Sequence, residues 1–332
     1  MVKLSVLDQA PISKGSTPEQ TLSNTLELAQ FTESLGYFRY WVAEHHNTNG
    51  LASTSPEILI ARIASVTKTI RVGSGGVLLP QYSPLKVAEN FKMLEAMFPG
   101  RIDLGLGRSP GGGQKTRLAL TDGTQKMLSA FSRQVKDLHG YLYNTLPDDH
   151  PYKGVIATPE TTSNPQTWVL GLSERGAKHA AINGTGFTFG HFISPAHSSE
   201  AISTYLERFR PSPERQDPFI NACVFVVCAP THEEAEELAL SQDMWLLQVE
   251  KGIETRVPSV QEVKEHTFTQ EELRKVEQNR KRAVIGTPNE VKERLETLAA
   301  EYQASELLLI TNIYDFEKKK QSYKLIAEAF NQ

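Results

Sequence analysis

Two adjacent histidines follow a carboxylate in the stretch "YWVAEHHNTNG", residues 40–50. Imidazole and carboxylate side chains can bind metals or transfer protons near neutral pH. A metal site needs three or more side chains directed at one centre, whereas neighbours on an extended strand point to opposite faces. His45 and His46 therefore cannot easily share an ion, and we predict no metal site. A single imidazole acting as acid or base and a purely structural pair both stay open.

Glycines form a second unusual group, the "GSGG" of residues 73–76. Glycine weakens strands and usually marks a close approach of the backbone or an unusual backbone conformation. Because they lack Cβ atoms, Gly75 and Gly76 would leave a flat surface for a planar ring. A tight bend or bulge in a sheet explains the same residues equally well.

Two further positions could hold an anion. The stretch "GLGRSPGGG", residues 105–113, resembles a dinucleotide-binding fingerprint only weakly, because no acidic residue ends a strand about 20 positions later. Its arginine, Arg108, can hold a phosphate through two parallel hydrogen bonds. Ser173 precedes a predicted helix whose free N–H groups form an anion site, and Gly176 and Ala177 leave room there for a ligand. A solvated arginine and an ordinary capping serine are the alternatives.

Extended apolar runs alternate with helical patterns along the chain, and several helices begin with Ser-Pro or Thr-Pro. The predicted strands cover residues 3–8, 37–44, 69–79, 101–107, 166–172, 184–193, 219–229 and 305–311. Eight strands that alternate with helices favour an α/β fold, a closed (β/α)8 TIM barrel, over a doubly wound sheet of five or six strands. We expect residues 1–332 to form a single domain.

A barrel of about 250 residues leaves about 80 residues for insertions. We place these near 145–165 and in the charged segment 250–285, and we expect one long polar helix over about 114–144. The carboxyl ends of barrel strands meet at one rim, where active sites lie. The residues expected at that rim are Asp8, Gln9, Ala10, Glu44, His45, His46, Ser74, Gly75, Gly76, Gly107, Arg108, Ser109, Leu172, Ser173, Gly190, His191, Thr311 and Asn312.

Composition excludes several classes of protein. Lys and Arg number 35 against 39 Asp and Glu, and this net charge of -4 argues against non-specific nucleic-acid binding. No apolar run approaches the length of about 18 residues that spans a membrane, and no signal peptide is evident. Cys223 and Cys228, the two cysteines, are expected to be core residues of a cytoplasmic protein.

Several segments together resemble the bacterial luciferase-like flavin monooxygenase family. They appear in the family's order and span almost the whole chain. The matching segments are "LDQAPISKGST", "LGYFRYWVAEHHN", "TKTIRVGSGGVLLPQYSPLKVAENFKMLEAMFPGRIDLGLGRSPGG", "TWVLGLSERGAKHAA" and "IGTPNEVKERLETLAAEYQASELLLIT". The resemblance implies a (β/α)8 barrel, commonly a homodimer, with FMN bound at the carboxyl-terminal rim.

The resemblance also assigns roles to residues. The histidine of the family's E-H-H motif, a catalytic base in luciferase, falls on His45, and a non-prolyl cis peptide beneath the flavin falls on Gly75–Gly76. The phosphate site falls on Arg108, Ser173 and Gly176. The remaining cofactor-binding residues that we expect at this rim are Ala10, Gly107 and Ala177.

Three positions depart from luciferase. Gly107 replaces a cysteine near the flavin, Leu172 replaces a glutamate, and Gly176 replaces a threonine, so that Gly176 offers only its backbone to a phosphate. Light emission is therefore not implied.

The resemblance implies a monooxygenase that takes reduced FMN as co-substrate and oxidises a small organic molecule with O2. Because no convincing NAD(P) fingerprint occurs, we expect a separate flavin reductase as partner. We also expect the segment 250–285, which is rich in Lys, Glu and Gln, to contain a mobile loop over the pocket. A deazaflavin (F420)-dependent oxidoreductase and a non-catalytic flavin-binding protein are the alternatives.

Overall fold

Eight parallel strands close into a barrel in the computed structural model, which describes residues 2–109, 111–253 and 255–331. The strand order is β6-β5-β4-β3-β2-β1-β9-β7, and β7 pairs with β6 to close the ring. The barrel strands are β1 (Lys3–Asp8), β2 (Arg39–Val42), β3 (Arg71–Leu78), β4 (Ile102–Gly107), β5 (Gln166–Gly171), β6 (Gly186–Phe189), β7 (Ile220–Cys228) and β9 (Glu306–Ile310). The predicted (β/α)8 TIM barrel is confirmed.

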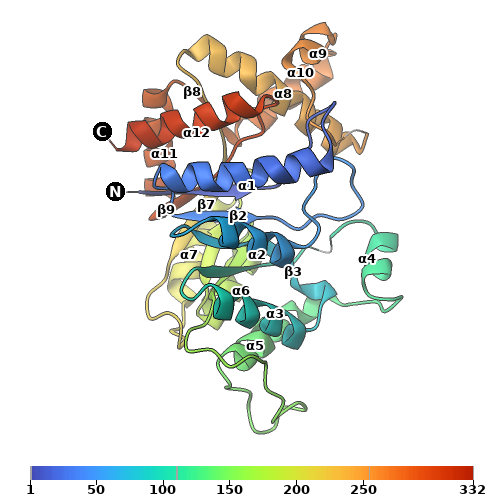
Figure 1. Cartoon of the computed structure of the whole chain (residues 1–332), viewed down its shortest axis with the longest axis vertical. Helices are drawn as coiled ribbons and strands as arrows, with labels where there is room; N and C mark the ends of the chain where they lie inside the picture. Colours follow the sequence, from blue (N-terminus) through green and yellow to red (C-terminus); the bar gives the residue numbers. More distant parts are fainter. Residues whose placement is uncertain (1, 110, 254, 332) are drawn as a thin grey trace.

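Helices surround the strands, and both chain termini lie on the left of Figure 1. They are α1 (Pro18–Ser34), α2 (Pro56–Val66), η1 (Leu79–Gln81), α3 (Pro84–Met97), α4 (Gln114–Leu120), η2 (Leu128–Ala130), α5 (Phe131–Leu142), α6 (Glu174–Asn183), α7 (Ser198–Arg208), α8 (His232–Lys251), α9 (Val260–Glu265), α10 (Gln270–Arg280), α11 (Pro288–Glu301) and α12 (Phe316–Phe330). Their starts follow the sequence signals, since proline opens α1, α2, α3 and α11. No helix within the described ranges is long and apolar enough to cross a membrane.

Two expectations about the elements were wrong. The polar stretch 114–144 is broken into α4, η2 and α5, and α4, which stands apart on the right of Figure 1, buries none of its residues. Without a buried face, a seven-residue helix cannot extend the packed α5 into one long helix. A ninth strand, β8 (Ala283–Gly286), lies inside the predicted insertion 250–285 and pairs with the second half of β7.

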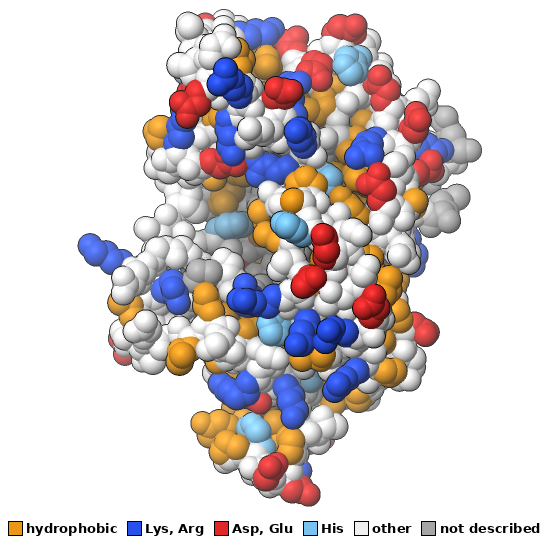
Figure 2. All heavy atoms as spheres, turned by 180° about the vertical axis from the view of Figure 1, so that it is seen from behind, with side chains coloured by type: hydrophobic (Ala, Val, Ile, Leu, Met, Phe, Trp, Pro, Cys, Tyr) orange, Lys and Arg blue, Asp and Glu red, His pale blue; other side chains and the backbone are white. Residues whose placement is uncertain are grey.

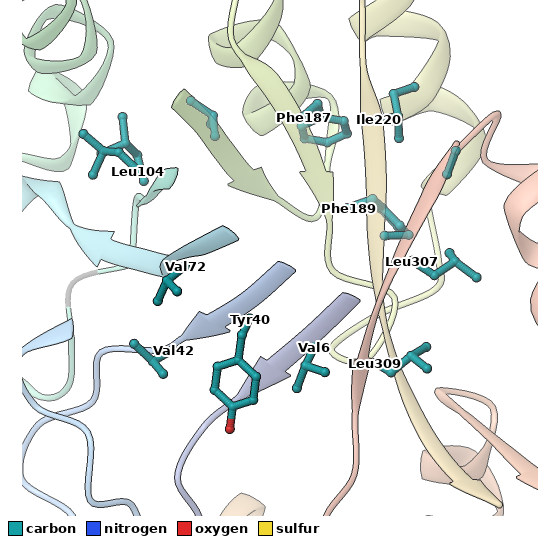
Figure 3. Packing of buried hydrophobic residues seen from close by; sticks show 14 of the residues in the cluster. Val6, Tyr40, Val42, Val72, Leu104, Phe187, Phe189, Ile220, Leu307 and Leu309 are labelled. Carbon is teal, nitrogen blue, oxygen red and sulfur yellow. The ribbon is translucent and has the colours of Figure 1, made fainter. Parts of the chain in front are cut away.

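Side chains that point out of the barrel form the layer between strands and helices. Figure 3 shows Val6, Tyr40, Val72, Leu104 and Phe187 in this layer, where each is buried and belongs to the main apolar cluster. Alternate residues of the same strands point inward, because successive strand side chains face opposite sides. The helices are therefore held to the barrel by apolar burial.

Tryptophans fill the interior of the barrel. The rings of Trp41 and Trp168 meet edge to face with centroids 5.5 Å apart. A Cβ atom at Gly186 would lie 2.3 Å from the Trp168 ring, and one at Gly73 would lie 2.8 Å from Trp41 Nε1. Several strand glycines therefore make room for the two large rings, and the interior is a packed core rather than a pore.

An ion network ties several strands together inside the barrel. Arg39 Nε lies 3.0 Å from both carboxylate oxygens of Glu306, and its NH1 group lies 2.8 Å from Asp103 Oδ2. Ser5 Oγ donates a hydrogen bond of 2.6 Å to Glu306. Arg39, Asp103 and Glu306 are at most 3% exposed. The network therefore joins β1, β2, β4 and β9.

Candidate active site

The carboxyl ends of the strands form a rim on the side where α4 stands in Figure 1. The β1–β2 pairing aligns Asp8 with Val42, and the β2–β3 pairing aligns Val42 with Ser74. One residue further along, Ala43 and Gly75 are therefore level, with His45 two residues above them. Figure 2, which shows the opposite face, has a hollow on its left side in which histidine atoms are visible.

His45 carries a buried nitrogen without a partner. Its backbone N–H donates to Ser53 O at 3.0 Å, but the side-chain Nδ1 atom has no hydrogen-bond partner among the residues that the structure describes. Burial, with a smaller effect of the His46 charge, lowers the pKa of His45 to about 4. At neutral pH this imidazole is therefore uncharged and able to accept a proton.

Glu44 holds the residues around His45 in place. Its buried carboxylate accepts hydrogen bonds from Leu78 N at 2.8 Å and Tyr82 Oη at 2.5 Å, and it lies 2.8 Å from His46 Nε2. Burial, followed by the bond to Glu44, raises the pKa of Tyr82, so this phenol stays a donor. Glu44 thus connects the end of β2 to the chain that follows β3. His46 contacts the same carboxylate, so its Nε2 atom is already engaged.

A glycine wall stands beside these residues. The Gly75–Gly76 peptide bond is cis, as the resemblance implied. A Cβ atom at Gly75 would lie 2.5 Å from Leu7 Cδ1, and one at Gly76 would lie 2.7 Å from Gly105 O. The register between β3 and β4 also shifts between Ser74 and Val77. The bulge that we considered as an alternative is therefore present, and it gives the barrel rim a surface free of side chains.

Arg108 follows β4 and has a free guanidinium, because no described residue pairs with it by a hydrogen bond or a salt bridge. Ser173 is the N-cap residue of α6, yet its exposed side chain makes no capping hydrogen bond. Arg108 adds to the positive charge felt by His179 of α6, together with Arg175 and Lys178. Arg108 and the amino-terminal half of α6 thus share a basic region with open hydrogen-bond donors, suited to an anion.

Small residues complete this part of the rim. A Cβ atom at Gly176 would lie 2.8 Å from Gly171 Cα, so the close packing of α6 on the end of β5 excludes a side chain there. Ala177 and Ala10 are at most 1% exposed, and Ala10 has a φ of 49°. At Gly107 a Cβ atom would lie 3.6 Å from Leu78 Cδ2 and from Val77 O, which are ordinary contacts. The glycine at position 107 is therefore not imposed by packing.

Two titratable strand-end residues lie outside this site. The Asp8 carboxylate turns toward α1 and accepts from Thr25 Oγ1 at 2.8 Å and Tyr40 Oη at 2.7 Å. His191 Nδ1 lies 2.6 Å from Tyr302 Oη of the residue that follows α11. Both side chains are buried and already bonded away from the rim, so they serve the packing of helices.

An aromatic wall on the other side of the rim was not found from the sequence. Phe192 and Trp245 each meet Phe225 edge to face, at 5.3 and 6.4 Å between centroids. This aromatic wall belongs to the apolar cluster that contains Leu7 and Trp41 of the barrel interior. Phe192 follows β6 and Trp245 lies in α8, so no local pattern in the sequence brings them together.

The segment 255–257 crosses the chain that leaves β1 and β2. Thr255 Oγ1 bonds to Thr48 at 2.8 Å, and Trp245 Nε1 donates to Thr255 O at 2.9 Å. Val257 N donates to Ile12 O at 2.9 Å. A Cβ atom at Gly50 would lie 1.8 Å from Thr255 O. Part of the segment expected to contain a mobile loop is therefore hydrogen-bonded to residues that follow β1 and β2. The mobility of this segment stays a prediction.

Among the described residues, no group of three His, Cys, Asp or Glu side chains could hold a metal ion. The site consists instead of an uncharged imidazole, a glycine wall, a basic anion region and an aromatic wall. Such an arrangement fits a planar cofactor with a phosphate tail better than it fits an ion.

Known proteins resemble this chain over nearly its whole length. The model of the luciferase-like monooxygenase family matches residues 2–304. YceB of Bacillus subtilis (strain 168), an uncharacterized protein, is 56% identical over 99% of this chain and 100% of its own. N-acetyl-S-alkylcysteine monooxygenase of the same strain is 34% identical over 99% of this chain and 98% of its own. The crystal structure of apo-MsnO8 has a TM-score of 0.88 at 36% identity, covering 100% of this chain and 99% of that one.

More distant structures share the fold alone. The oxygenating constituent of 3,6-diketocamphane monooxygenase, in complex with FMN, has a TM-score of 0.71 at 19% identity, with 99% of this chain and 97% of that one covered. An F420-dependent secondary alcohol dehydrogenase has the same TM-score at 15% identity, with 99% and 98% covered. The family model and relatives above 30% identity both extend over nearly all of the sequence. The chain therefore belongs to the luciferase-like monooxygenase family.

Proposed function

We propose that this chain is an FMN-dependent monooxygenase that oxidises a small organic substrate with O2. One oxygen atom enters the substrate and the other leaves as water, while reduced FMN supplies two electrons and ends as FMN. The observation that carries the proposal is the buried Nδ1 atom of His45. It has no described partner and lies just above the level of the Gly75–Gly76 wall.

The residues at the rim fit FMN at several points. The Gly75–Gly76 wall offers a surface without side chains to a planar ring. The guanidinium of Arg108 has no described partner, and the hydroxyl of Ser173 makes no capping hydrogen bond. Both groups can donate hydrogen bonds to a phosphate. The backbone N–H of Gly176 lies in the first turn of the same helix. When bound, reduced FMN supplies the electrons that activate O2.

Three small residues line the same cofactor site in this proposal. Ala10 and Ala177 are buried, so they bring backbone close to the cofactor without bulk. Gly107 lies next to Arg108, where a Cβ atom would make only ordinary contacts of 3.6 Å or more. These residues would contribute shape rather than hydrogen bonds from side chains.

His45 is the proposed proton carrier. Its lowered pKa keeps the imidazole uncharged at neutral pH, so one ring nitrogen has a free lone pair for a proton. Glu44 and Tyr82 are positioning residues, because their hydrogen bonds fix the end of β2 against the chain that follows β3. The aromatic wall and the segment 255–257 would exclude water from the reacting groups, which protects the reduced cofactor from wasteful oxidation.

We also propose a flavin reductase and a second copy of the chain as partners. The absence of a convincing NAD(P) fingerprint in the sequence means that another protein would deliver reduced FMN. The exposed apolar residues Ile58 of α2 and Met93 and Met97 of α3 are 71%, 57% and 47% exposed. These two helices pack side by side, so a homodimer could bury their apolar side chains together.

The first compounds to test come from a relative. N-acetyl-S-alkylcysteine monooxygenase is named for an N-acylated thioether, a small molecule with an apolar arm. The aromatic wall at this rim suits such an arm. We therefore choose N-acetyl-S-benzyl-L-cysteine as the probe substrate.

The test is incorporation of labelled oxygen. The protein is incubated with the probe, FMN, NADH, a flavin reductase and 18O2, and the product is analysed by mass spectrometry. One 18O atom per product molecule is expected, with product forming about 100-fold more slowly in His45→Gln. Purification without added cofactor separates the alternatives, because a bound deazaflavin would replace FMN in the absorption spectrum. Tight FMN binding with no substrate-dependent O2 consumption across a panel of thioethers and aldehydes would indicate a flavin-binding protein.

A further inference from the structure

Three neighbouring barrel strands, β9, β1 and β2, lead into side chains that carry buried polar atoms without a described partner. These atoms are Asn312 Nδ2, Gln9 Oε1 and His45 Nδ1. The β1–β9 pairing aligns Val6 with Leu309, so three residues further along Gln9 is level with Asn312. The three residues therefore follow adjacent strands along one arc of the rim, with His45 two residues above the level of Gln9 and Asn312.

Both amide side chains belong to the inner face of the barrel. Leu7 and Ile310, two residues before Gln9 and Asn312, belong to the same interior cluster as Trp41. Because side chains two positions apart on a strand share a face, Gln9 and Asn312 continue this inner face upward. They are 7% and 1% exposed, so water reaches neither freely.

A buried polar atom without a partner is destabilising and calls for an explanation. Here the two atoms have opposite character, since Asn312 Nδ2 is a donor and Gln9 Oε1 is an acceptor. The complement of this pair is a group that accepts at one atom and donates at its neighbour. A secondary amide, with its carbonyl oxygen and its N–H, is such a group.

The surroundings of the two amides favour an uncharged polar group joined to an apolar arm. The Asp8 carboxylate, next to Gln9, is bonded to Thr25 and Tyr40 on the far side of the strand. The aromatic wall lies within the same apolar cluster as the inner face below the two amides. A polar group at the amides and an apolar arm on the aromatic wall would therefore fit within one site.

We infer that Gln9 and Asn312 bind a secondary amide group of the organic substrate. Asn312 Nδ2 donates to the amide oxygen, the amide N–H donates to Gln9 Oε1, and the apolar arm packs against Phe225 and Trp245. This inference rests on the proposed function, whose substrate class it names: small N-acylated molecules with an apolar arm.

Calorimetric binding to the FMN-loaded protein tests this assignment without turnover. The probes are N-acetyl-S-benzyl-L-cysteine and its ester analogue, in which an oxygen atom replaces the amide N–H. We expect the wild type to bind the amide at least about tenfold more tightly than the ester, because the ester leaves Gln9 Oε1 unpaired. Gln9→Met should reduce this preference to less than about twofold. Asn312→Leu should weaken both probes, by about tenfold.

The control is Asn164→Leu, which alters another amide with an unpartnered oxygen, far along the chain in the connector before β5. It should leave both affinities unchanged, and circular dichroism checks that each variant is folded. Equal binding of the two probes by the wild type, no binding of either, or a preference that survives Gln9→Met would overturn the assignment. Oxygen incorporation measured in parallel tests the monooxygenase proposal separately, because amide-selective binding without 18O in the product would refute only that proposal.

Discussion

The Nε2 atom of His46 lies 2.8 Å from Oε1 of Glu44, and this contact gives the two adjacent histidines different roles. His46 is bound to a carboxylate that also holds Leu78 and Tyr82. His45, its neighbour, keeps a buried Nδ1 atom without a described partner. The pair thus contains one structural and one available imidazole.

Replacing His45 tests this division. His45→Gln should lower kcat for the probe substrate by about 100-fold or more, the usual scale for loss of a positioned acid or base. Binding of FMN should change little, because the proposed phosphate contacts lie on β4 and α6. His46→Gln is the matched variant and should act mainly through stability. The proposal fails if His45→Gln turns over the probe at the wild-type rate.

The pKa of His45 predicts a titration far from the usual range for histidine. It is lowered from 6.5 to about 4, mainly by burial, so the unfolded chain binds the proton more tightly than the folded one. Stability should therefore fall as the pH drops from about 6.5 toward 4. NMR titration of 15N-labelled histidine, with His45→Gln for assignment, measures the value directly. A midpoint near 6.5 would contradict this lowered pKa.

Arg108 should dominate phosphate recognition. We expect Arg108→Ala to weaken FMN binding by about 1–3 kcal/mol, the scale of lost charge-assisted hydrogen bonds. Riboflavin, which lacks the phosphate, should bind both proteins alike. Arg175→Ala removes an exposed arginine from the first turn of α6 and serves as the control. Fluorescence titration gives the affinities, and an unchanged FMN affinity would remove Arg108 from this role.

Two rim glycines should respond differently to a methyl group. Gly176→Ala would place Cβ 2.8 Å from Gly171 Cα, a clash between two backbones, and should destabilise the fold by about 1–3 kcal/mol. Gly107→Ala makes only an ordinary contact at 3.6 Å and should change stability by less than about 0.5 kcal/mol. Urea denaturation of the two variants compares them. Equal stability would show that α6 can move away from β5.

Arg39 should be the costliest residue to truncate inside the barrel. Arg39→Ala would leave the buried carboxylates of Asp103 and Glu306 short of a partner, a loss of about 3–5 kcal/mol. Because the network links strands from both ends of the chain, we propose that the whole chain unfolds as one domain in a single transition. Lys324→Ala, on the exposed side of α12, should be neutral. Two separate transitions in urea would contradict the single-domain proposal.

Much of the fold could be predicted from local patterns. Proline and hydroxyl residues mark the starts of α1, α2, α3 and α11, and each barrel strand is an apolar run. Strand β8 was not predicted, because its four residues alternate between half-buried and buried positions and follow a highly charged helix. The break after α4 was not predicted either. The residues of this polar stretch have high helix propensity, but a stable helix also needs a face that it can bury.

The parts of the site that lie within one segment could be predicted from the sequence. The parts that form where distant segments meet could not. Glu44, His45 and the glycine pair are contiguous motifs, and their separate uses follow from strand alternation. The aromatic wall joins Phe192, Phe225 and Trp245 from three elements, and only tertiary packing brings them together. The close approach of Gly171 and Gly176 is likewise a property of how α6 sits on β5.

The pairing of β1 with β9 joins two strands that are far apart in the sequence, and this has a consequence for the growing chain. Lys3 leaves the ribosome long before Glu306, its partner in the ladder. Until the chain has been completed to that point, β1 has one edge with unpaired backbone groups, open to other strands in the cell. The nascent chain is therefore exposed to misassembly between the synthesis of β1 and that of β9, whose pairing relieves this exposure.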